Sequence, residues 1–123
     1  MLTFDRRSRG PSWLSSIGAL LAAVAIGLSA YAAHAALVPL AQSHLQTAAL
    51  YAFGHGLALA ALGRRNERML AHVVLCLLLL GTLLFSGSLA GNALAQWPTR
   101  LAPIGGVTLM LGWLLWAMDA LRR

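Results

Sequence analysis

Six polar side chains within one long apolar stretch are the best candidates for chemistry in this chain. They are Tyr31, His34, Gln46, Thr47, Tyr51 and His55. The stretch from Gly10 to Gly63 contains no Asp, Glu, Lys or Arg, so these residues fall where a membrane-spanning segment is expected. Titratable groups inside a bilayer are costly, and they mark ligand sites, proton paths or contacts between helices. We therefore treat the six as a candidate intramembrane polar site. The alternative is that each histidine is a neutral imidazole that hydrogen-bonds a neighbouring helix.

The acidic residues are too few and too peripheral for a carboxylate-based proton path. Asp and Glu occur only at positions 5, 67 and 119. If the protein is a small proton-coupled exporter, a histidine would have to carry the proton instead of a carboxylate. Asp119 precedes Arg122 and Arg123 by three and four residues, which predicts an ion pair on one face of a helix end.

The sequence predicts no enzyme, cofactor or metal site. It contains no HExxH motif, nucleophile elbow or phosphate-binding loop. His34 and His55 would differ by roughly 9 Å in depth along their helices, which argues against two axial ligands on one haem. A metal site at His34 and His44 would lack a third ligand. We expect His44 and His72 to be solvated at the membrane interface and the single Cys76 to be a buried hydrophobe.

The elements that position these residues must be transmembrane helices. Apolar residues make up 59% of the chain and charged residues 10%, against roughly 45–50% and about 25% in soluble domains. Spans of about 20 apolar residues cross a bilayer as helices. The sequence predicts an all-α, four-helix transmembrane bundle over residues 13–121, with spans at 13–37, 46–63, 69–94 and 101–121. A turn is expected at 39–44, a cytoplasmic arm at 1–12 and a cytoplasmic end at 122–123.

The arginines predict the orientation of these spans. They lie at 6, 7 and 9, at 64, 65 and 68, and at 122 and 123, while only Arg100 falls on the other side. The positive-inside rule then places both ends of the chain in the cytoplasm of a bacterial inner membrane. The formal charge of +6 is explained by this bias and by contact with the lipid bilayer rather than by nucleic acid. A cleaved signal peptide is the alternative for the first span, but the apolar run from Trp13 to Val38 is longer than such peptides carry.

Small residues predict how the helices pack, because helices in lipid associate through close approach of their backbones. The first span has a stripe of small residues at three- and four-residue steps, including Gly18 and Ser29. The third and fourth spans carry the others: Gly81, Gly87, Ser88, Gly91 and Asn92, then Gly105, Gly106 and Gly112.

Several of these motifs resemble the YgdD family of small inner-membrane proteins and the related transmembrane protein 256 group. Residues 29–34, Ser-Ala-Tyr-Ala-Ala-His, are similar to the family's Gly-Ala-Phe-Gly-Ala-His signature. Residues 84–89 and 103–106, with Gly112 and Trp113, resemble its third- and fourth-helix motifs. Ser29 and Ala32 stand where the family usually has glycine, and Ala90 where it has tyrosine. The resemblance implies a four-helix membrane protein of unknown function and supplies no catalytic residue.

We therefore expect an accessory or interaction subunit that packs through small-residue helix faces, either in a larger membrane complex or as a homo-oligomer. The alternative is a small transporter or channel whose path is lined by His55 and the other polar residues of the candidate site.

Overall fold

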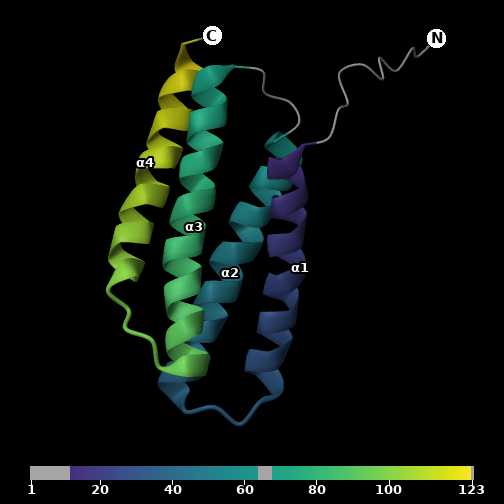
Figure 1. The fold of residues 1–123 in the computed structure, drawn as a ribbon, viewed down its shortest axis with the longest axis vertical. Coiled ribbons are helices and arrows are strands. Elements are labelled where there is room, and N and C mark those ends of the chain that lie inside the picture. The colour runs from purple at the N-terminus through teal and green to yellow at the C-terminus, as the bar shows by residue number, and fades with distance from the viewer. Residues whose placement is uncertain (1–11, 64–67, 123) are drawn as a thin grey trace, which may run out of the picture.

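The computed structural model describes residues 12–63 and 68–122, which form four helices (Figure 1). These are α1 (Trp13–His34), α2 (Pro39–Leu62), α3 (Met69–Ala95) and α4 (Leu101–Leu121). Each is long and apolar enough to cross a bilayer, and no strand occurs among the described residues. The predicted all-α fold with four membrane-spanning helices is confirmed. The residues outside this description are 1–11 of the predicted arm, 64–67 and Arg123. They include five of the six arginines in the first two clusters, at positions 6, 7, 9, 64 and 65, while Arg68 is described.

The turn between α1 and α2 lies earlier than the sequence indicated. α1 ends at His34 and α2 begins at Pro39, so residues 39–44 are helical rather than a turn. Proline fits the first turn of a helix because the N–H it lacks would have no intrahelical partner there. The side-chain amide of Gln42 donates through Nε2 to the carbonyl of Ala32 at 3.0 Å, which satisfies one of the last carbonyls of α1.

The turn between α3 and α4 depends on one residue in an unusual conformation. Gln96 ends α3 with φ 58°, in the left-handed backbone region that residues other than glycine seldom adopt. Its N–H donates to the carbonyl of Asn92 at 3.1 Å, and the N–H of Trp97 donates to the carbonyl of Gly91 at 3.2 Å. The Trp97 ring lies so close over Gly91 that a Cβ there would overlap it.

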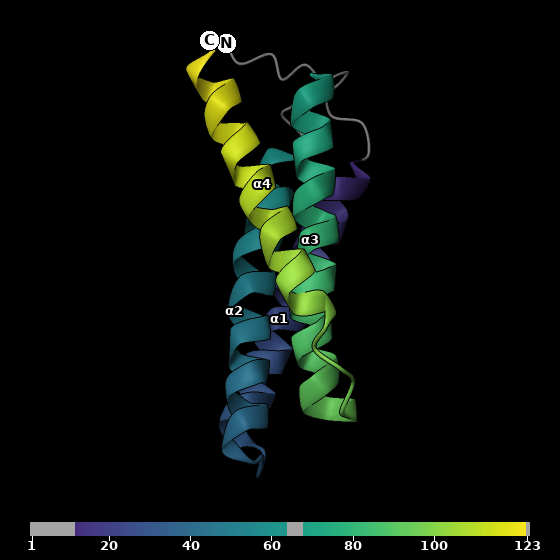
Figure 2. The ribbon, with the colours of Figure 1, turned by 90° about the vertical axis from the view of Figure 1, so that its left-hand side faces the viewer.

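The helices lie in an open row, in which α1 packs on α2, α2 on α3, and α3 on α4 (Figures 1 and 2). Over the described residues, the backbones of α2 and α4 do not approach each other closely, and neither do those of α1 and α4. The start of α1 and the end of α4 lie at one end of the molecule, which we call the terminal end. The turns at 35–38 and 96–100 lie at the other, which we call the hairpin end.

Two pairs of glycines set the closest contacts in this row. A Cβ on Gly18 of α1 would lie 2.6 Å from the carbonyl oxygen of Gly56 in α2, and a Cβ on Gly56 would lie 2.7 Å from that of Gly18. In the second hairpin, a Cβ on Gly105 of α4 would lie 2.8 Å from the carbonyl oxygen of Gly81 in α3. Gly56 was not among the predicted packing residues, although the small residues Ala52, Gly56 and Ala60 at four-residue steps indicate such a face.

The other residues predicted to pack have different surroundings. A Cβ on Gly112 would meet Leu78 at 2.8 Å, whereas one on Gly106 would make only an ordinary contact with Phe85 at 3.7 Å. The Ser88 hydroxyl donates to the Pro98 carbonyl at 3.3 Å, so it fixes the second turn. Gly87 and Ser29 are exposed, and a Cβ on Gly87 would meet nothing within 4 Å.

The ion pair of Asp119 is not the one that the sequence predicted. Asp119 is buried, and its carboxylate pairs with Arg68 at the start of α3, with Nη2 to Oδ1 at 2.9 Å and Nη1 to Oδ2 at 3.2 Å. Arg122 is exposed, and Arg123 lies outside the described residues. The sequence does not indicate Arg68 because the predicted pair considers one helix alone, whereas position 119 faces the neighbouring helix.

Leucine at position 105 should separate α3 from α4, because its side chain has no room beside the backbone of Gly81 and Phe85. We expect the Gly105→Leu variant to lose about 1–3 kcal/mol or more of stability, as overpacked cores do. Unfolding in mixed detergent micelles, followed by helical circular dichroism, measures the loss. Gly87→Leu is the matched control, and an equal loss in both variants would contradict the role of the Gly81–Gly105 contact.

Removal of the Arg68 guanidinium should leave the buried Asp119 carboxylate unpaired. We expect Arg68→Gln to lose about 1–2 kcal/mol, less than a fully buried pair would because Arg68 is itself partly exposed. Arg122→Gln removes the same charge at the same end of the molecule and should have little effect. The same unfolding assay compares the two, and the pairing is refuted if Arg122→Gln is the more damaging change.

Candidate functional site

The structure distributes the six predicted site residues over separate surfaces. Tyr31 and His34 are exposed near the hairpin end of α1. Gln46 lies on the side of α2 that faces α1, whereas Tyr51 and His55 line a hollow formed with α3 and α4. Among the described residues, the side chains of Tyr31, His34, Gln46 and Thr47 make no hydrogen bond in the chain. The six therefore do not form one polar patch.

His55 is buried, and both of its ring nitrogens are occupied. Its Nδ1 lies 2.8 Å from the carbonyl oxygen of Tyr51, and the indole N–H of Trp113 donates to its Nε2 at 2.9 Å. A carbonyl only accepts and an indole N–H only donates, so Nδ1 must carry the proton and Nε2 must not. His55 is thus a neutral imidazole that ties α2 to α4. This arrangement matches the alternative of a histidine that hydrogen-bonds a neighbouring helix.

Aromatic rings surround this histidine. Tyr51 stacks on His55 with ring centroids 6.1 Å apart, and Phe85 of α3 meets Tyr51 edge-on at 4.8 Å. Trp113 lies 5.8 Å from His55. Together with Gly106, Leu109, Met110 and Leu114, these residues line a hollow of about 500 Å³. Tyr51, Met110, Trp113 and Leu114 are exposed, so the hollow opens toward the bilayer.

His44 lies in a second hydrogen-bonded group, nearer the hairpin end. Its Nδ1 lies 2.8 Å from Oδ1 of Asn92, whose Nδ2 donates to the Trp97 carbonyl at 2.7 Å. Because the amide nitrogen of Asn92 is used for Trp97, its oxygen must face His44, so Nδ1 of His44 carries a proton. His44 is therefore part of the contact between α2 and α3. This differs from the prediction that His44 is simply solvated at the interface. His72 is exposed, and its ring lies 6.2 Å from that of Trp13.

His44 also lines a hollow that continues the one beside His55. This second hollow has a volume of about 430 Å³, and it includes Thr99, Ala102 and Pro103 at the start of α4. The two hollows share Phe85, Gly106 and Met110. They therefore form one groove between α2 and α4, with α3 as its floor, which we call the α2/α4 groove. No pattern in the sequence indicates this groove, because it depends on which helices lie apart.

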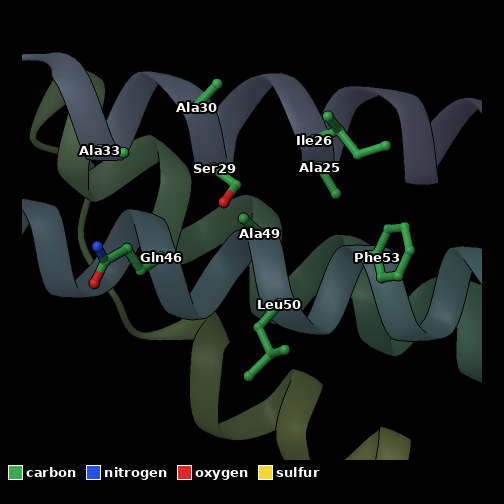
Figure 3. Close-up of a pocket in the computed structure, with 9 residues that line it drawn as sticks. All are labelled: Ala25, Ile26, Ser29, Ala30, Ala33, Gln46, Ala49, Leu50 and Phe53. Atoms are coloured by element: carbon green, nitrogen blue, oxygen red, sulfur yellow. The ribbon is translucent and has the colours of Figure 1, made fainter.

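A third hollow, of about 660 Å³, lies between α1 and α2 toward the hairpin end (Figure 3). Most of its lining residues are small or aliphatic: Ala25, Ile26, Ala30, Ala33, Ala49 and Leu50, with Phe53. Its two polar side chains are Ser29, which points toward Ala49 in Figure 3, and Gln46. We call it the α1/α2 groove.

Comparison with known proteins gives a consistent result. Residues 28–106 match the family described as "Protein of unknown function (DUF423)". The chain is 38% identical over 106 residues to a UPF0382 membrane protein of Staphylococcus saprophyticus, which covers 80% of this chain and 88% of the relative. It is 34% identical over 113 residues to one of Staphylococcus epidermidis, covering 86% and 93%.

A UPF0382 membrane protein of Staphylococcus aureus is 33% identical over 106 residues, covering 80% of this chain and 87% of the relative. No solved structure matches the chain. The resemblance that the sequence motifs indicated is thus confirmed. The chain belongs to the DUF423 family and is a multi-pass membrane protein.

Proposed function

We propose that the protein is an accessory subunit of the bacterial inner membrane that acts through helix-to-helix contacts, with the outer face of α1 as its contact surface. α1 stands at one edge of the helix row. Its buried residues, Leu14, Gly18, Ala25 and Ala32, face α2. The opposite face is open to the bilayer in a single copy of the chain.

A stripe of small side chains on that opposite face carries the proposal. Its members are Ser16, Ala19, Ala23, Gly27 and Ala30, and all are exposed. At 100° per residue they fall on the side of α1 opposite the buried residues. A Cβ on Gly27 would meet nothing within 4 Å. Small residues at four-residue steps let another helix approach closely, which is how helices associate in lipid.

Two unpaired polar side chains beside this stripe support the same conclusion. Ser29 and Gln46 lie in the α1/α2 groove, which also includes Ala30 of the stripe. Gln46 lies roughly 10 Å along α2 from its start, within the expected span. A primary amide without a partner in hydrocarbon is costly, and a polar group from another helix would satisfy it.

The helix that best fits this stripe is α1 of a second copy. Two copies with the same orientation run parallel in the membrane, which is the geometry of dimers built on small residues at four-residue steps. A twofold contact places the same residues on both sides, and this stripe of small side chains is complementary to itself. A helix from a larger membrane complex is the other source of such a partner.

The orientation is part of the proposal. Arg68 and Arg122 lie toward the terminal end, and Arg100 lies at the hairpin end. The positive-inside rule supports a cytoplasmic terminal end, with the start of α1 and the end of α4 both inside. A transporter is less well supported, because both ring nitrogens of His55 are already bonded.

Disulfide cross-linking in native membranes tests the contact. In a Cys76→Ser background, Ala23→Cys should yield a species of twice the chain mass on mild oxidation. Leu80→Cys is the control, since Leu80 is exposed on α3 at a comparable distance from the terminal end. Adding Gly27→Leu to Ala23→Cys should lower the yield about fivefold, as expected for loss of about 1 kcal/mol of interhelical contact.

Equal cross-linking at positions 23 and 80, or none at 23, would refute self-association through α1. Purification in mild detergent then decides about the accessory role. A stoichiometric complex with another membrane protein that survives Gly87→Leu but not Gly27→Leu would assign the face to that partner. Retention of the complex in both variants would refute the face altogether.

A further inference from the structure

We propose that the α2/α4 groove binds one acyl chain of an anionic phospholipid, with the phosphate of its headgroup held at the hairpin end near Arg100. This inference is independent of the contact face on α1. It depends on the shape of the groove, on the chemistry along it, and on an arginine that the charge pattern of the chain does not explain.

The groove has the length and position of a lipid tail. It begins at Thr99 and Ala102, where α4 enters the bilayer, and it extends to Trp113 and Leu114. From Arg100 to Trp113 an α-helix rises about 20 Å, which exceeds the roughly 15 Å of one hydrocarbon leaflet. The hollow therefore follows the direction and depth of a chain anchored at the interface.

The polarity of the lining changes along this length. Deep in the membrane most of the lining is apolar or aromatic, with Phe85, Met110 and Leu114 beside Tyr51 and Trp113. His55 also lines this part, but both of its ring nitrogens are already hydrogen-bonded. Near the hairpin end it includes the Thr99 hydroxyl and the His44 ring. An amphiphile with a polar head at the interface and a hydrocarbon tail matches this order.

The end of the groove near the interface offers donors for a phosphate. Nδ1 of His44 is held by Asn92, and no hydrogen bond to its Nε2 is found among the described residues. The bond to Asn92 fixes the orientation of the ring, which lines this end of the groove. Arg100 lies between Thr99 and Ala102, which both line the groove, and it is exposed. The first turn of α4 also has no acidic residue and no side-chain cap.

Arg100 needs an explanation, because it is the only Lys or Arg between Met69 and Met118 and lies at the hairpin end, whereas Arg68 and Arg122 lie toward the terminal end. The positive-inside bias disfavours a cation at that position. No acidic side chain pairs with Arg100 among the described residues. A lipid phosphate supplies the missing anion, since a guanidinium binds phosphate with two parallel hydrogen bonds.

The width of the groove favours a lipid tail over a helix. Trp113 and His55 bond directly across it, from α4 to α2, at 2.9 Å. A helix of about 10–12 Å diameter could not enter at this depth without breaking that bond. A single hydrocarbon chain can lie along the aromatic rings with the bond intact. Gly106 lines the middle of the groove, where an added Cβ would make only an ordinary contact with Phe85 at 3.7 Å.

Native mass spectrometry of the full-length protein tests the assignment, with phosphatidylglycerol or phosphatidylcholine added to the same detergent. We expect one phosphatidylglycerol to be retained per chain, with phosphatidylcholine bound at least about fivefold more weakly for lack of net negative charge. Arg100→Gln should reduce phosphatidylglycerol binding by about the same factor. Gly106→Leu, which fills the groove, should abolish retention of both lipids.

Two control variants make the result specific. Arg122→Gln removes one positive charge at the terminal end, and Gly87→Leu adds the same bulk on an exposed face outside the groove. Both should retain phosphatidylglycerol as the wild type does, and helical circular dichroism checks that every variant is folded. Equal retention of the two lipids, or no difference between Arg100→Gln and Arg122→Gln, would overturn the headgroup assignment.

Retention that survives Gly106→Leu would overturn the groove as the site. Occupation by a second copy is tested separately by oxidation of Met110→Cys in a Cys76→Ser background. A cross-linked dimer through position 110 would show that protein and not lipid covers the groove, which would also refute the proposal. No dimer, together with loss of lipid in Gly106→Leu, supports it.

Discussion

Close approach of glycine backbones is the constraint on which the rest of this structure depends. Lipid tails solvate leucine as well as another helix does, so apolar area alone does not hold membrane helices together. The contacts between Gly18 and Gly56 and between Gly81 and Gly105 bring two pairs of helices to distances that a single methyl group would prevent. Each pair forms one antiparallel hairpin, and α2 and α3 then join the two hairpins. The grooves arise because other pairs of helices have no such contact.

Polar side chains add connections between the helices, and one of them joins α2 and α4, whose backbones stay apart. Trp113 and His55 connect α4 to α2, His44 and Asn92 connect α2 to α3, and Arg68 and Asp119 connect α3 to α4 at the terminal end. In each case a donor meets an acceptor, and the histidines need no charge to take part. These three contacts help to fix the spacing of the row, and this spacing determines the shape of the α2/α4 groove.

The sequence predicted the helices well and the contacts between them only in part. Length and hydropathy were sufficient for four spans, and the small-residue stripes correctly indicated Gly18, Gly81 and Gly105. The start of α2 differs from the prediction because the polar run Gln42, Ser43 and His44 favours a turn, although Pro39 suits a first helical turn. The partners of His55, His44 and Asp119 lie on other helices, so no spacing within one helix could indicate them. In spans that are apolar on every side, periodicity does not tell which face meets protein and which meets lipid.

The division into two hairpins has a consequence for biogenesis. Each hairpin contains its own glycine contact and its own turn, closed by Gln42 in the first and by Ser88 and Asn92 in the second. The first hairpin can therefore form before α3 has entered the membrane. Insertion then proceeds in two stages, and the interface between α2 and α3 is completed last. An insertase would handle two compact helical pairs in succession rather than four separate segments.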